Sequence, residues 1–286
     1  MVRGVIVAAV ADSVRELAVG VGGVELRGVH DRLDDVEFLA PEWGDVPDLA
    51  SMPALRVVQI LSAGSDWIEP SLPPGVVLCN ARGTRDIPVA EWVVGAILGA
   101  ATGLLEGARR VVWEHRVPAE VSGSRIVIVG FGSIGLAAAS RLSALGATVV
   151  GVGRSRLGEL SRLVADADVV VDLVPLTDAS RGMFDATVFG AMRDGALFVN
   201  AGRGGTVDQD ALLAELPRLR AVLDVTDPEP LPTGHPLWTA PGVLSITSHQ
   251  AGDSFEADTR AAQFAVDQLR AYVAGSPLRN VVPLLS

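Results

Sequence analysis

The sequence predicts an α/β protein with parallel sheets in two domains. Short apolar runs of strand length alternate with polar connections and helical patterns through most of the chain. Residues 125–156 also combine a buried strand, a glycine-rich turn, a helix and a second strand in one continuous unit. The length of 286 residues suffices for roughly two domains, each with its own core.

The composition is that of a folded, acidic protein. Apolar residues make up 49% of the chain and charged residues 20%, which is typical of globular proteins rather than disordered ones. The net charge of -11 argues against nucleic acid or an anionic membrane as a partner, but it permits a local positive pocket for a small anion. All 23 basic residues are arginine, so Schiff-base chemistry on a lysine is excluded.

The single cysteine, Cys79, lies in the apolar run VVLCN and is expected to be buried rather than a nucleophile or ligand. One cysteine allows no internal disulfide, which favours a reducing, cytoplasmic location. The longest uncharged run, residues 92–105, is shorter than the roughly 20 residues needed to span a bilayer, so we expect a buried or subunit-contacting helix. The N-terminus resembles a first core strand rather than a signal peptide, and no metal site is expected.

The first part of the chain is expected to form a small α/β layer, with strands within residues 4–10, 24–29, 36–40, 55–61 and 75–80. Residues 62–66, SAGSD, follow one of these strands. Their backbone N–H groups could hold a carboxylate, although an ordinary turn is an equal alternative. Pro88 is expected in the first turn of a helix that runs from about residue 89 through residue 107.

The unit at 125–156 contains the motif GxGxxG, formed by Gly130, Gly132 and Gly135. After a strand and before a helix, these glycines allow a tight turn, close approach of backbone to a pyrophosphate and close helix packing. We expect Gly146 to end the helix. Its apolar positions at helical spacing are Leu136, Ala139, Leu142 and Leu145. The unit therefore favours dinucleotide binding over the alternative of a structural turn.

The second half continues the pattern of strands and helices. Strands are expected within residues 165–176, 195–202, 220–226 and 243–249, and helices within 180–192 and 208–219. A proline-rich loop covers 227–242. The last helix, at about 255–274, is amphipathic, with an apolar set of Ala262, Phe264, Val266 and Leu269.

Three polar residues, Arg203, Glu229 and His249, stand just beyond strand ends in this half. Ligands of open α/β sheets bind outside the carboxyl ends of the strands, so these side chains are expected to converge. A histidine with a carboxylate partner can donate and accept protons near neutral pH, and an arginine suits a 2-keto carboxylate. Taken singly, each residue could instead be a surface charge, a loop carboxylate or a core histidine.

Taken together, these residues make the chain resemble the D-2-hydroxyacid dehydrogenase family. The matching segments are SAGSD, NARGTRDIPVAEW, IVIVGFGSIG, VPLT, NAGRGGTVD, LDVTDPEPLP, HPLW, ITSHQAG and YVAGSPLRNVV, in the family's order and over nearly the whole chain. The resemblance implies that Arg203 binds and polarises the substrate, that His249 is the general acid and base, and that Glu229 is its partner. The remaining histidines, His30, His115 and His235, are expected to be structural or solvated.

The resemblance also implies a fold and a set of binding residues. The fold would be a Rossmann-type doubly wound sheet, residues 89–252, inserted into a flavodoxin-like α/β substrate domain of residues 1–88 plus 253–286. The first domain would include a helix that forms a homodimer. Asp224 would lie at the nicotinamide carboxamide. The cofactor set is Gly130, Gly132, Ser133, Ile134, Gly135, Arg154, Ser155, Arg156, Pro175, Ala201, Asp224 and Gly252, and the substrate set is Ala63, Gly64, Arg85 and Arg203.

The chain departs from the family pattern in three places. NAD-preferring members carry an acid after the second strand of the glycine unit, whereas this chain has Gly153 followed by Arg154, Ser155 and Arg156. Arginine and serine would bind a 2'-phosphate, which favours NADP(H) over NAD(H) unless these side chains are merely solvated. The short connection from Gly153 to the next strand predicts a sheet without its outer edge strand. Arg85 replaces a small polar residue and could add positive charge for an anionic substrate, or simply be exposed.

We therefore predict an NADPH-dependent reductase of a small 2-keto acid such as glyoxylate or hydroxypyruvate, which produces the D-2-hydroxy acid. Glu229 beside His249 distinguishes this reading from formate-oxidising relatives, where a glutamine is expected. The alternative is a dinucleotide-sensing regulatory or interaction protein of the same fold without significant turnover. The presence of Arg203, Glu229 and His249 together favours turnover.

Overall fold

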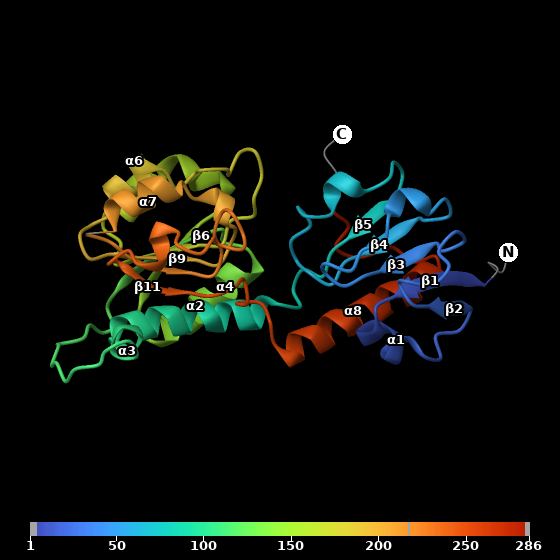
Figure 1. Ribbon diagram of the computed structural model, residues 1–286, viewed down its shortest axis with the longest axis horizontal. Helices are drawn as coiled ribbons and strands as arrows, with labels where there is room; N and C mark the ends of the chain where they lie inside the picture. Colours follow the sequence, from blue (N-terminus) through green and yellow to red (C-terminus); the bar gives the residue numbers. More distant parts are fainter. Residues whose placement is uncertain (1–4, 217, 284–286) are drawn as a thin grey trace. The chain divides into compact units, whose positions relative to one another are not determined.

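The computed structural model describes residues 5–216 and 218–283, and the chain divides into two compact units. Unit 1 combines Met1–Arg85 with Asp253–Ser286, and unit 2 is Asp86–Gly252. The sequence placed the two crossings after residues 88 and 252. Each unit contains one sheet in which all strand pairs are parallel (Figure 1). The predicted α/β class with two parallel sheets is confirmed.

The sheet of unit 1 has the strand order β2-β1-β3-β4-β5, which is the flavodoxin-like order. Its strands are β1 (Ile6–Val10), β2 (Val24–Arg27), β3 (Phe38–Ala40), β4 (Val57–Gln59) and β5 (Val77–Cys79). Successive residues of β1 face opposite sides, because Ala8 and Val10 join one core cluster and Ala9 the other. Helices α1 (Asp12–Ala18) and α8 (Phe255–Val273) cover the first of these faces. The 3-10 helices η1 (Leu49–Ser51) and η2 (Glu69–Ser71) flank β4 in sequence.

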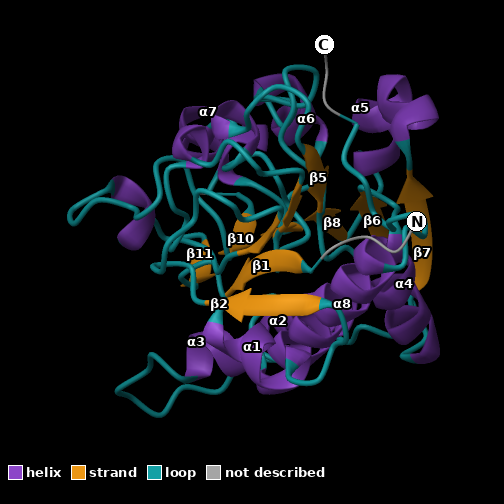
Figure 2. Ribbon diagram, turned by 90° about the vertical axis from the view of Figure 1, so that its right-hand side faces the viewer, coloured by secondary structure: helices purple, strands orange, loops and turns teal. Residues whose placement is uncertain are grey.

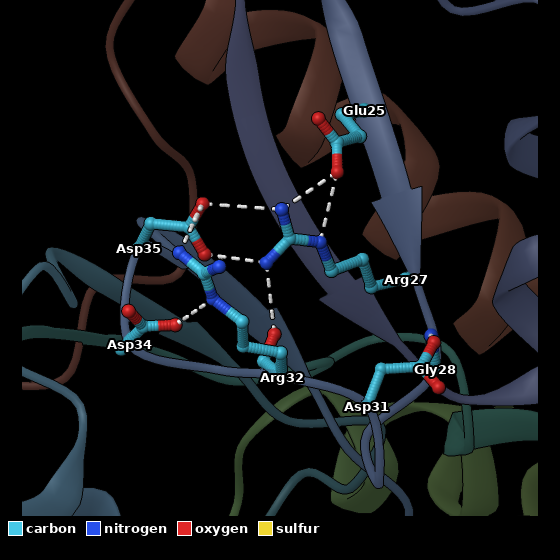
Figure 3. A network of polar contacts seen from close by, with 7 residues as sticks. All are labelled: Glu25, Arg27, Gly28, Asp31, Arg32, Asp34 and Asp35. Carbon is cyan, nitrogen blue, oxygen red and sulfur yellow. Dashed lines mark hydrogen bonds and ion pairs between the residues drawn. The ribbon is translucent and has the colours of Figure 1, made fainter.

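A network of charged side chains lies on β2 and on the loop after it, at the edge of this sheet (Figure 3). Arg27 donates to Glu25 over 2.9 Å, to the carbonyl of Arg32 over 2.9 Å, and to Asp35. The hydrogen bond from Arg27 lowers the pKa of Asp35. Exposed pairs of this kind add little stability, but charges along an edge strand discourage pairing with another chain.

The sheet of unit 2 has the order β11-β10-β9-β8-β6-β7. Its strands are β6 (Arg125–Val129), β7 (Thr148–Val152), β8 (Val169–Asp172), β9 (Leu197–Asn200), β10 (Arg220–Leu223) and β11 (Val243–Ile246). Strand β7 is the last strand on its side. Only the 3-10 helix η3 (Arg154–Glu159) and the short helix α5 (Leu160–Val164) lead from it to β8. The predicted sheet without its outer edge strand is therefore confirmed.

Helices cover both faces of this sheet (Figure 2). Helices α2 (Asp86–Ala101), α3 (Leu104–Gly107) and α4 (Ser133–Ala144) are associated with one core cluster, and α5, α6 (Ala186–Ala191) and α7 (Gln209–Glu215) with the other. Two further 3-10 helices are η4 (Gly204–Thr206) and η5 (Pro236–Trp238). Within the ranges 5–216 and 218–283, no helix combines the length and apolar character that crossing a bilayer requires.

One helix prediction needs correction. The expected helix at 89–107 is two helices, because Gly103 adopts a positive φ of 74° between α2 and α3. Pro88 does lie in the first turn of α2. The apolar residues at helical spacing on α4 are not all buried, since Leu136 is 57% exposed and Leu145 is 39% exposed. The buried positions of α4 are Gly135, Ala138 and Leu142.

The other end signals were read correctly. Gly146 follows α4 with a φ of 87°, so it ends that helix as expected. Helix α8 covers nearly the predicted range, and Ser254 caps it by accepting a hydrogen bond from the N–H of Ala257. Cys79 is fully buried, and burial raises the pKa of its thiol to about 11. It is therefore a core residue at the end of β5.

Candidate active site

The glycine turn links β6 to α4 and leaves one open position. Gly130 has a φ of 90°, and a Cβ there would lie 2.5 Å from the carbonyl carbon of Leu173. A Cβ on Gly135 would lie 2.7 Å from the carbonyl oxygen of Gly130. Gly132 differs, because its φ is -89° and a Cβ there would meet no atom within 4 Å. The fold itself thus requires the first and third glycines, while the second borders open space at the start of α4.

The N-terminus of α4 suits an anion. Gly132 is its N-cap residue and offers no side-chain hydrogen bond to the first turn, and Ser133 and Ile134 are the first two helical residues. The N–H groups at the start of a helix carry partial positive charge and can bind phosphate. The turn therefore fits the pyrophosphate of a dinucleotide.

The segment after β7 carries the residues that the sequence assigned to a 2'-phosphate. Arg154 and Ser155 are exposed at the start of η3. Arg156 is half-buried and donates to Glu159 over 3.3 Å and to the carbonyl of Gly151 over 3.2 Å. The positive charge of Arg156 is thus partly used within the protein, and Arg154 and Ser155 present the more accessible groups.

His249 and Glu229 form a hydrogen-bonded pair beyond the ends of β11 and β10. The distance between Nδ1 of His249 and Oε2 of Glu229 is 2.8 Å, and the side chains are 36% and 35% exposed. The other carboxylate oxygen of Glu229 accepts from the N–H of Thr226 over 3.0 Å. His249 has a φ of 53°, and its N–H donates to the carbonyl of Asp224 over 2.8 Å. Both partners are therefore held by backbone contacts.

The pair shifts both pKa values in the direction that favours ionisation. The hydrogen bond that His249 donates to Glu229 raises the pKa of His249, although burial and the charge of Arg203 act against it. Burial acts to raise the pKa of Glu229, but hydrogen bonds from His249 and Thr226, together with the charges of His249 and Arg203, bring it below its ordinary value. Because Nδ1 faces Glu229, proton exchange with a substrate falls to Nε2.

Arg203 approaches this pair from the loop after β9. Its charge affects the pKa values of both His249 and Glu229, and its NH1 group donates to the carbonyl of Gly202 over 2.9 Å. A Cβ on the next residue, Gly204, would lie 1.9 Å from the carbonyl oxygen of Thr226. The loops of Arg203 and Glu229 are therefore in direct backbone contact. The structure brings Arg203, Glu229 and His249 together at the carboxyl ends of β9, β10 and β11.

Comparison with known proteins agrees with this arrangement. The sequence model of the domain described as "D-isomer specific 2-hydroxyacid dehydrogenase, NAD binding domain" matches residues 94–251. The chain belongs to the D-isomer-specific 2-hydroxyacid dehydrogenase family. The resemblance seen in the sequence is thereby confirmed. The chain is accordingly an NAD(P)-dependent oxidoreductase with a Rossmann domain.

Relatives of the family cover most of the chain. A glyoxylate/hydroxypyruvate reductase B from Salmonella newport is 32% identical over 82% of this chain and 80% of its own. An NADPH-dependent glyoxylate/hydroxypyruvate reductase from Sinorhizobium meliloti, solved with NADP and sulfate, gives a TM-score of 0.83 at 28% identity, with 98% of both chains covered. A family member from Xanthobacter autotrophicus, solved with NADPH and MES, gives a TM-score of 0.85 at 26% identity over 98% of both chains.

Asp224, which the family resemblance placed at the nicotinamide, is 2% exposed. Its carboxylate accepts from the hydroxyl of Thr247 over 2.5 Å and from the N–H groups of Gln250 and Ala251 over 3.0 and 2.9 Å. These bonds hold the loop that carries His249. Its contact with a cofactor stays a prediction. The same holds for the remaining cofactor positions, which are Pro175 after β8, Ala201 directly after β9, and Gly252 at the end of unit 2.

The predicted substrate residues of unit 1 are described within that unit. The carbonyl of Ala63 accepts from the amide of Asn80 over 2.9 Å, and the carbonyl of Gly64 accepts from Trp67 over 3.1 Å. Arg85 donates to Asp253 over 3.2 Å and to Asp258 over 2.8 Å. The two carboxylates offset much of the charge that the sequence suggested for an anionic substrate. The substrate roles of Ala63, Gly64 and Arg85 stay predictions.

The sequence reasoning missed a buried polar group beside the site. Asp172, at the end of β8, is fully buried, and burial raises the pKa of its carboxyl to about 7. It contacts the buried hydroxyl of Thr206, which lies in the loop that carries Arg203. The available signal was a single acid inside the apolar run VVVDLV. Elsewhere in the described residues, no group of three or more His, Cys, Asp or Glu side chains could hold a metal ion.

Proposed function

We propose that this family member is an NADPH-dependent reductase of a small 2-keto acid, such as glyoxylate or hydroxypyruvate, and that it forms the D-2-hydroxy acid. The observation that carries the proposal is the His249–Glu229 pair with Arg203 beside it. This arrangement supplies a proton donor held in orientation by a carboxylate, together with a cation for an anionic substrate.

The residues of the site have separate roles in the proposed reaction. A reduced nicotinamide cofactor, with its pyrophosphate held at the turn of Gly132, would supply a hydride for the keto carbon. Arg203 pairs with the substrate carboxylate and stabilises the negative charge that develops on the keto oxygen. His249 donates the proton from Nε2 to that oxygen. Glu229 holds the ring at Nδ1 and raises the pKa of His249, which favours the protonated ring.

Two observations support NADPH as the reductant. Gly153 stands where an acid would repel a 2'-phosphate, and the exposed side chains of Arg154 and Ser155 follow it directly. Two structural relatives at 26% and 28% identity contain NADPH or NADP. A glycine followed by arginine and serine gives a 2'-phosphate donors without a competing negative charge.

The substrate class is supported by the site and by the relatives. A small keto acid needs one cation and one proton donor within a short distance, which Arg203 and His249 provide in unit 2. The relatives from Salmonella newport and Sinorhizobium meliloti bear the names of glyoxylate/hydroxypyruvate reductases. These observations favour glyoxylate or hydroxypyruvate over bulkier acids.

We also propose a homodimer formed through unit 2. The segment after α3 projects from unit 2 (Figure 1) and carries the exposed apolar side chains Val111, Val112, Trp113 and Val117. Leu104 on α3 is exposed as well. Apolar side chains that cluster on a surface mark contact sites. A second copy of this chain is the partner that suits the family resemblance.

The test is steady-state reduction of glyoxylate, hydroxypyruvate and bulkier 2-keto acids, with NADPH and NADH in parallel. We expect turnover with the small acids and a lower KM for NADPH than for NADH. His249→Asn should bind NADPH normally and lose turnover, which separates catalysis from cofactor binding. The alternative, a dinucleotide sensor without turnover, would bind NADPH tightly but oxidise none with any of these acids, and that result would reject the proposal.

A further inference from the structure

Asp172 lies between the cofactor turn and the loop that carries Arg203. The segment after it packs against both, because a Cβ on Gly130 would lie 2.5 Å from the carbonyl carbon of Leu173 and a Cβ on Gly202 would lie 2.8 Å from the carbonyl oxygen of Val174. Asp172 is 0% exposed, and so is Thr206. A charged carboxyl group is costly at such a position.

The Thr206 hydroxyl makes two short contacts with oxygen atoms, and each contact requires a proton. Its Oγ1 lies 2.5 Å from Oδ2 of Asp172 and 2.6 Å from the carbonyl oxygen of Arg203. A hydroxyl group has one proton to donate, and a carbonyl oxygen has none. If Asp172 were ionised, Thr206 could satisfy only one of these two contacts, and the other would join two oxygens without a proton between them.

A protonated Asp172 resolves both contacts. Its Oδ2–H group would donate to Thr206, and the Thr206 hydroxyl would donate onward to the carbonyl of Arg203. The other carboxyl oxygen, Oδ1, accepts from the N–H of Val174 over 2.8 Å, as the carbonyl oxygen of a protonated carboxyl group can. The carbonyl of Arg203 also accepts from the amide of Asn200 over 3.2 Å, so two buried side chains fix the backbone there.

We infer that Asp172 is a positioning residue for Arg203: in its protonated form it directs the Thr206 hydroxyl to the Arg203 carbonyl and so holds the substrate-binding loop. The inference rests on the proposed role of Arg203 in binding the 2-keto acid. When Asp172 loses its proton, Thr206 turns its hydroxyl toward the carboxylate. The Arg203 carbonyl then loses one hydrogen bond.

The surroundings of Asp172 contain little charge. Its neighbours across the sheet are Val129 on β6 and Asn200 on β9, both uncharged. Burial raises the pKa of Asp172 to about 7, while the contacts with Thr206 and Val174 act in the opposite direction. The charged groups of the adjoining loops include Arg203, Glu229 and His249, and also Arg181, whose NH1 group would lie 3.3 Å from a Cβ on Gly205. The pKa shift of Asp172 comes from burial, Thr206 and Val174.

The kinetic test follows the KM for glyoxylate from about pH 5 to about pH 9 at saturating NADPH. In the wild-type protein we expect one step near pH 7, over which KM rises about fivefold, the factor that corresponds to one lost hydrogen bond. Asp172→Asn should lack the step, because its amide donates to Thr206 at every pH. Thr206→Val should also lack it, with a raised KM throughout, and Thr206→Ser should retain it.

The exposed Asp194 provides a matched control, since Asp194→Asn removes an acid of the same unit far from this chain of hydrogen bonds. It should keep the step. An Asp172→Asn profile with the wild-type step would overturn the inference, because another group would then titrate.

An infrared measurement tests the proton without turnover. The wild-type protein at about pH 6 should show the C=O band of a buried protonated carboxyl group, and the band should vanish in Asp172→Asn and at high pH. Absence of the band at about pH 6 overturns the inference even if glyoxylate is reduced. If the protein reduces no 2-keto acid, the proposed function fails, whereas the band still reports on Asp172.

Discussion

His249 Nδ1 lies 2.8 Å from Glu229 Oε2, although 20 residues separate them in sequence. Asp224 connects the two loops. Its carbonyl accepts from the N–H of His249, and its carboxylate accepts from Thr247, Gln250 and Ala251, which flank His249 in sequence. A buried acid at the end of β10 thus fixes the histidine backbone, and a half-buried acid fixes its ring.

Glu229→Gln should move the pH dependence of reduction toward acid. Glu229 raises the pKa of His249 above its ordinary value of 6.5. Reduction requires the protonated ring, so the rate falls as pH rises through this raised pKa. The glutamine lacks the charge that stabilises the imidazolium, and burial then lowers the pKa. We expect kcat/KM for glyoxylate to drop about tenfold at neutral pH, and less at acidic pH.

The control for this prediction is the reverse reaction. Oxidation of a D-2-hydroxy acid needs neutral His249, so Glu229→Gln should extend its activity toward lower pH. His249→Asn should lose roughly 10²- to 10⁴-fold of the activity in both directions, and the remaining activity should not show the pH dependence caused by His249. If the activity of Glu229→Gln changed at the same pH as that of the wild-type protein, another group would limit the pH profile.

Gly132→Ala and Gly130→Ala should separate cofactor binding from folding. A Cβ on Gly132 would meet no protein atom within 4 Å. A Cβ on Gly130 would lie 2.5 Å from the Leu173 carbonyl group, and Gly130 also has a φ of 90°. The free energy of unfolding of Gly132→Ala should lie within about 0.5 kcal/mol of the wild-type value, and that of Gly130→Ala should be lower by about 2 kcal/mol or more. Thermal unfolding measures both.

The binding half of this prediction concerns Gly132. Its added methyl group would occupy the space through which a pyrophosphate approaches the turn. We expect Gly132→Ala to weaken NADPH and NADH alike in a fluorescence titration. Normal affinity for both would place the pyrophosphate elsewhere.

The sequence predicted those parts of the structure that depend on local pattern. Strands β6 to β11 appear as apolar runs, and Arg203, Glu229 and His249 follow three strand ends that a parallel sheet brings to one edge. The break at Gly103 could not be distinguished, because Gly99 occurs in the same run and remains within α2. Whether a glycine continues or ends a helix depends on contacts that the local sequence does not contain.

Tertiary contacts explain the other failures. Leu136 falls at helical spacing with the other apolar residues of α4 and is nevertheless exposed, because close packing against the Gly130 turn selects the side of α4 that carries Gly135. Asp172 was missed because it stands in an apolar strand, and its partner Thr206 is 34 residues away. The direction of a hydrogen-bond chain depends on distances between oxygens, which no sequence spacing specifies.

Arg154→Ala should reduce the preference for NADPH more than Arg156→Ala does. Arg154 is exposed after β7, while Arg156 is already bound to Glu159 and to the carbonyl of Gly151. Losing a charged hydrogen bond to a 2'-phosphate should raise the KM for NADPH about tenfold or more, with the KM for NADH little changed. Equal effects of the two substitutions would show that Arg156 releases Glu159 when the cofactor binds.

Asp172→Asn should change how stability varies with pH. The folded pKa of about 7 lies above the ordinary value of 3.8, so the folded protein holds the extra proton between these values. The stabilising contribution of this proton is complete below the lower value and is lost as pH rises through the higher one. The variant lacks this loss. Between about pH 5 and pH 8, the free energy of unfolding of Asp172→Asn should therefore rise relative to that of the wild-type protein by about 1 to 3 kcal/mol. Chemical denaturation at each pH measures the difference, and parallel curves would contradict the prediction.

Trp113→Ser should weaken the proposed dimer. Trp113 is fully exposed in the segment after α3, beside Val112, although aromatic side chains of this size are usually covered. If a second copy covers it, its removal should cost about 1.5 to 3 kcal/mol, which raises the dimer dissociation constant about tenfold or more. Light scattering across a dilution series measures this constant. Trp43→Ser is the matched control, since Trp43 is an exposed tryptophan of unit 1 and its loss should leave the mass unchanged. A wild-type protein that is monomeric at every concentration would instead assign the 111–117 segment to a different partner.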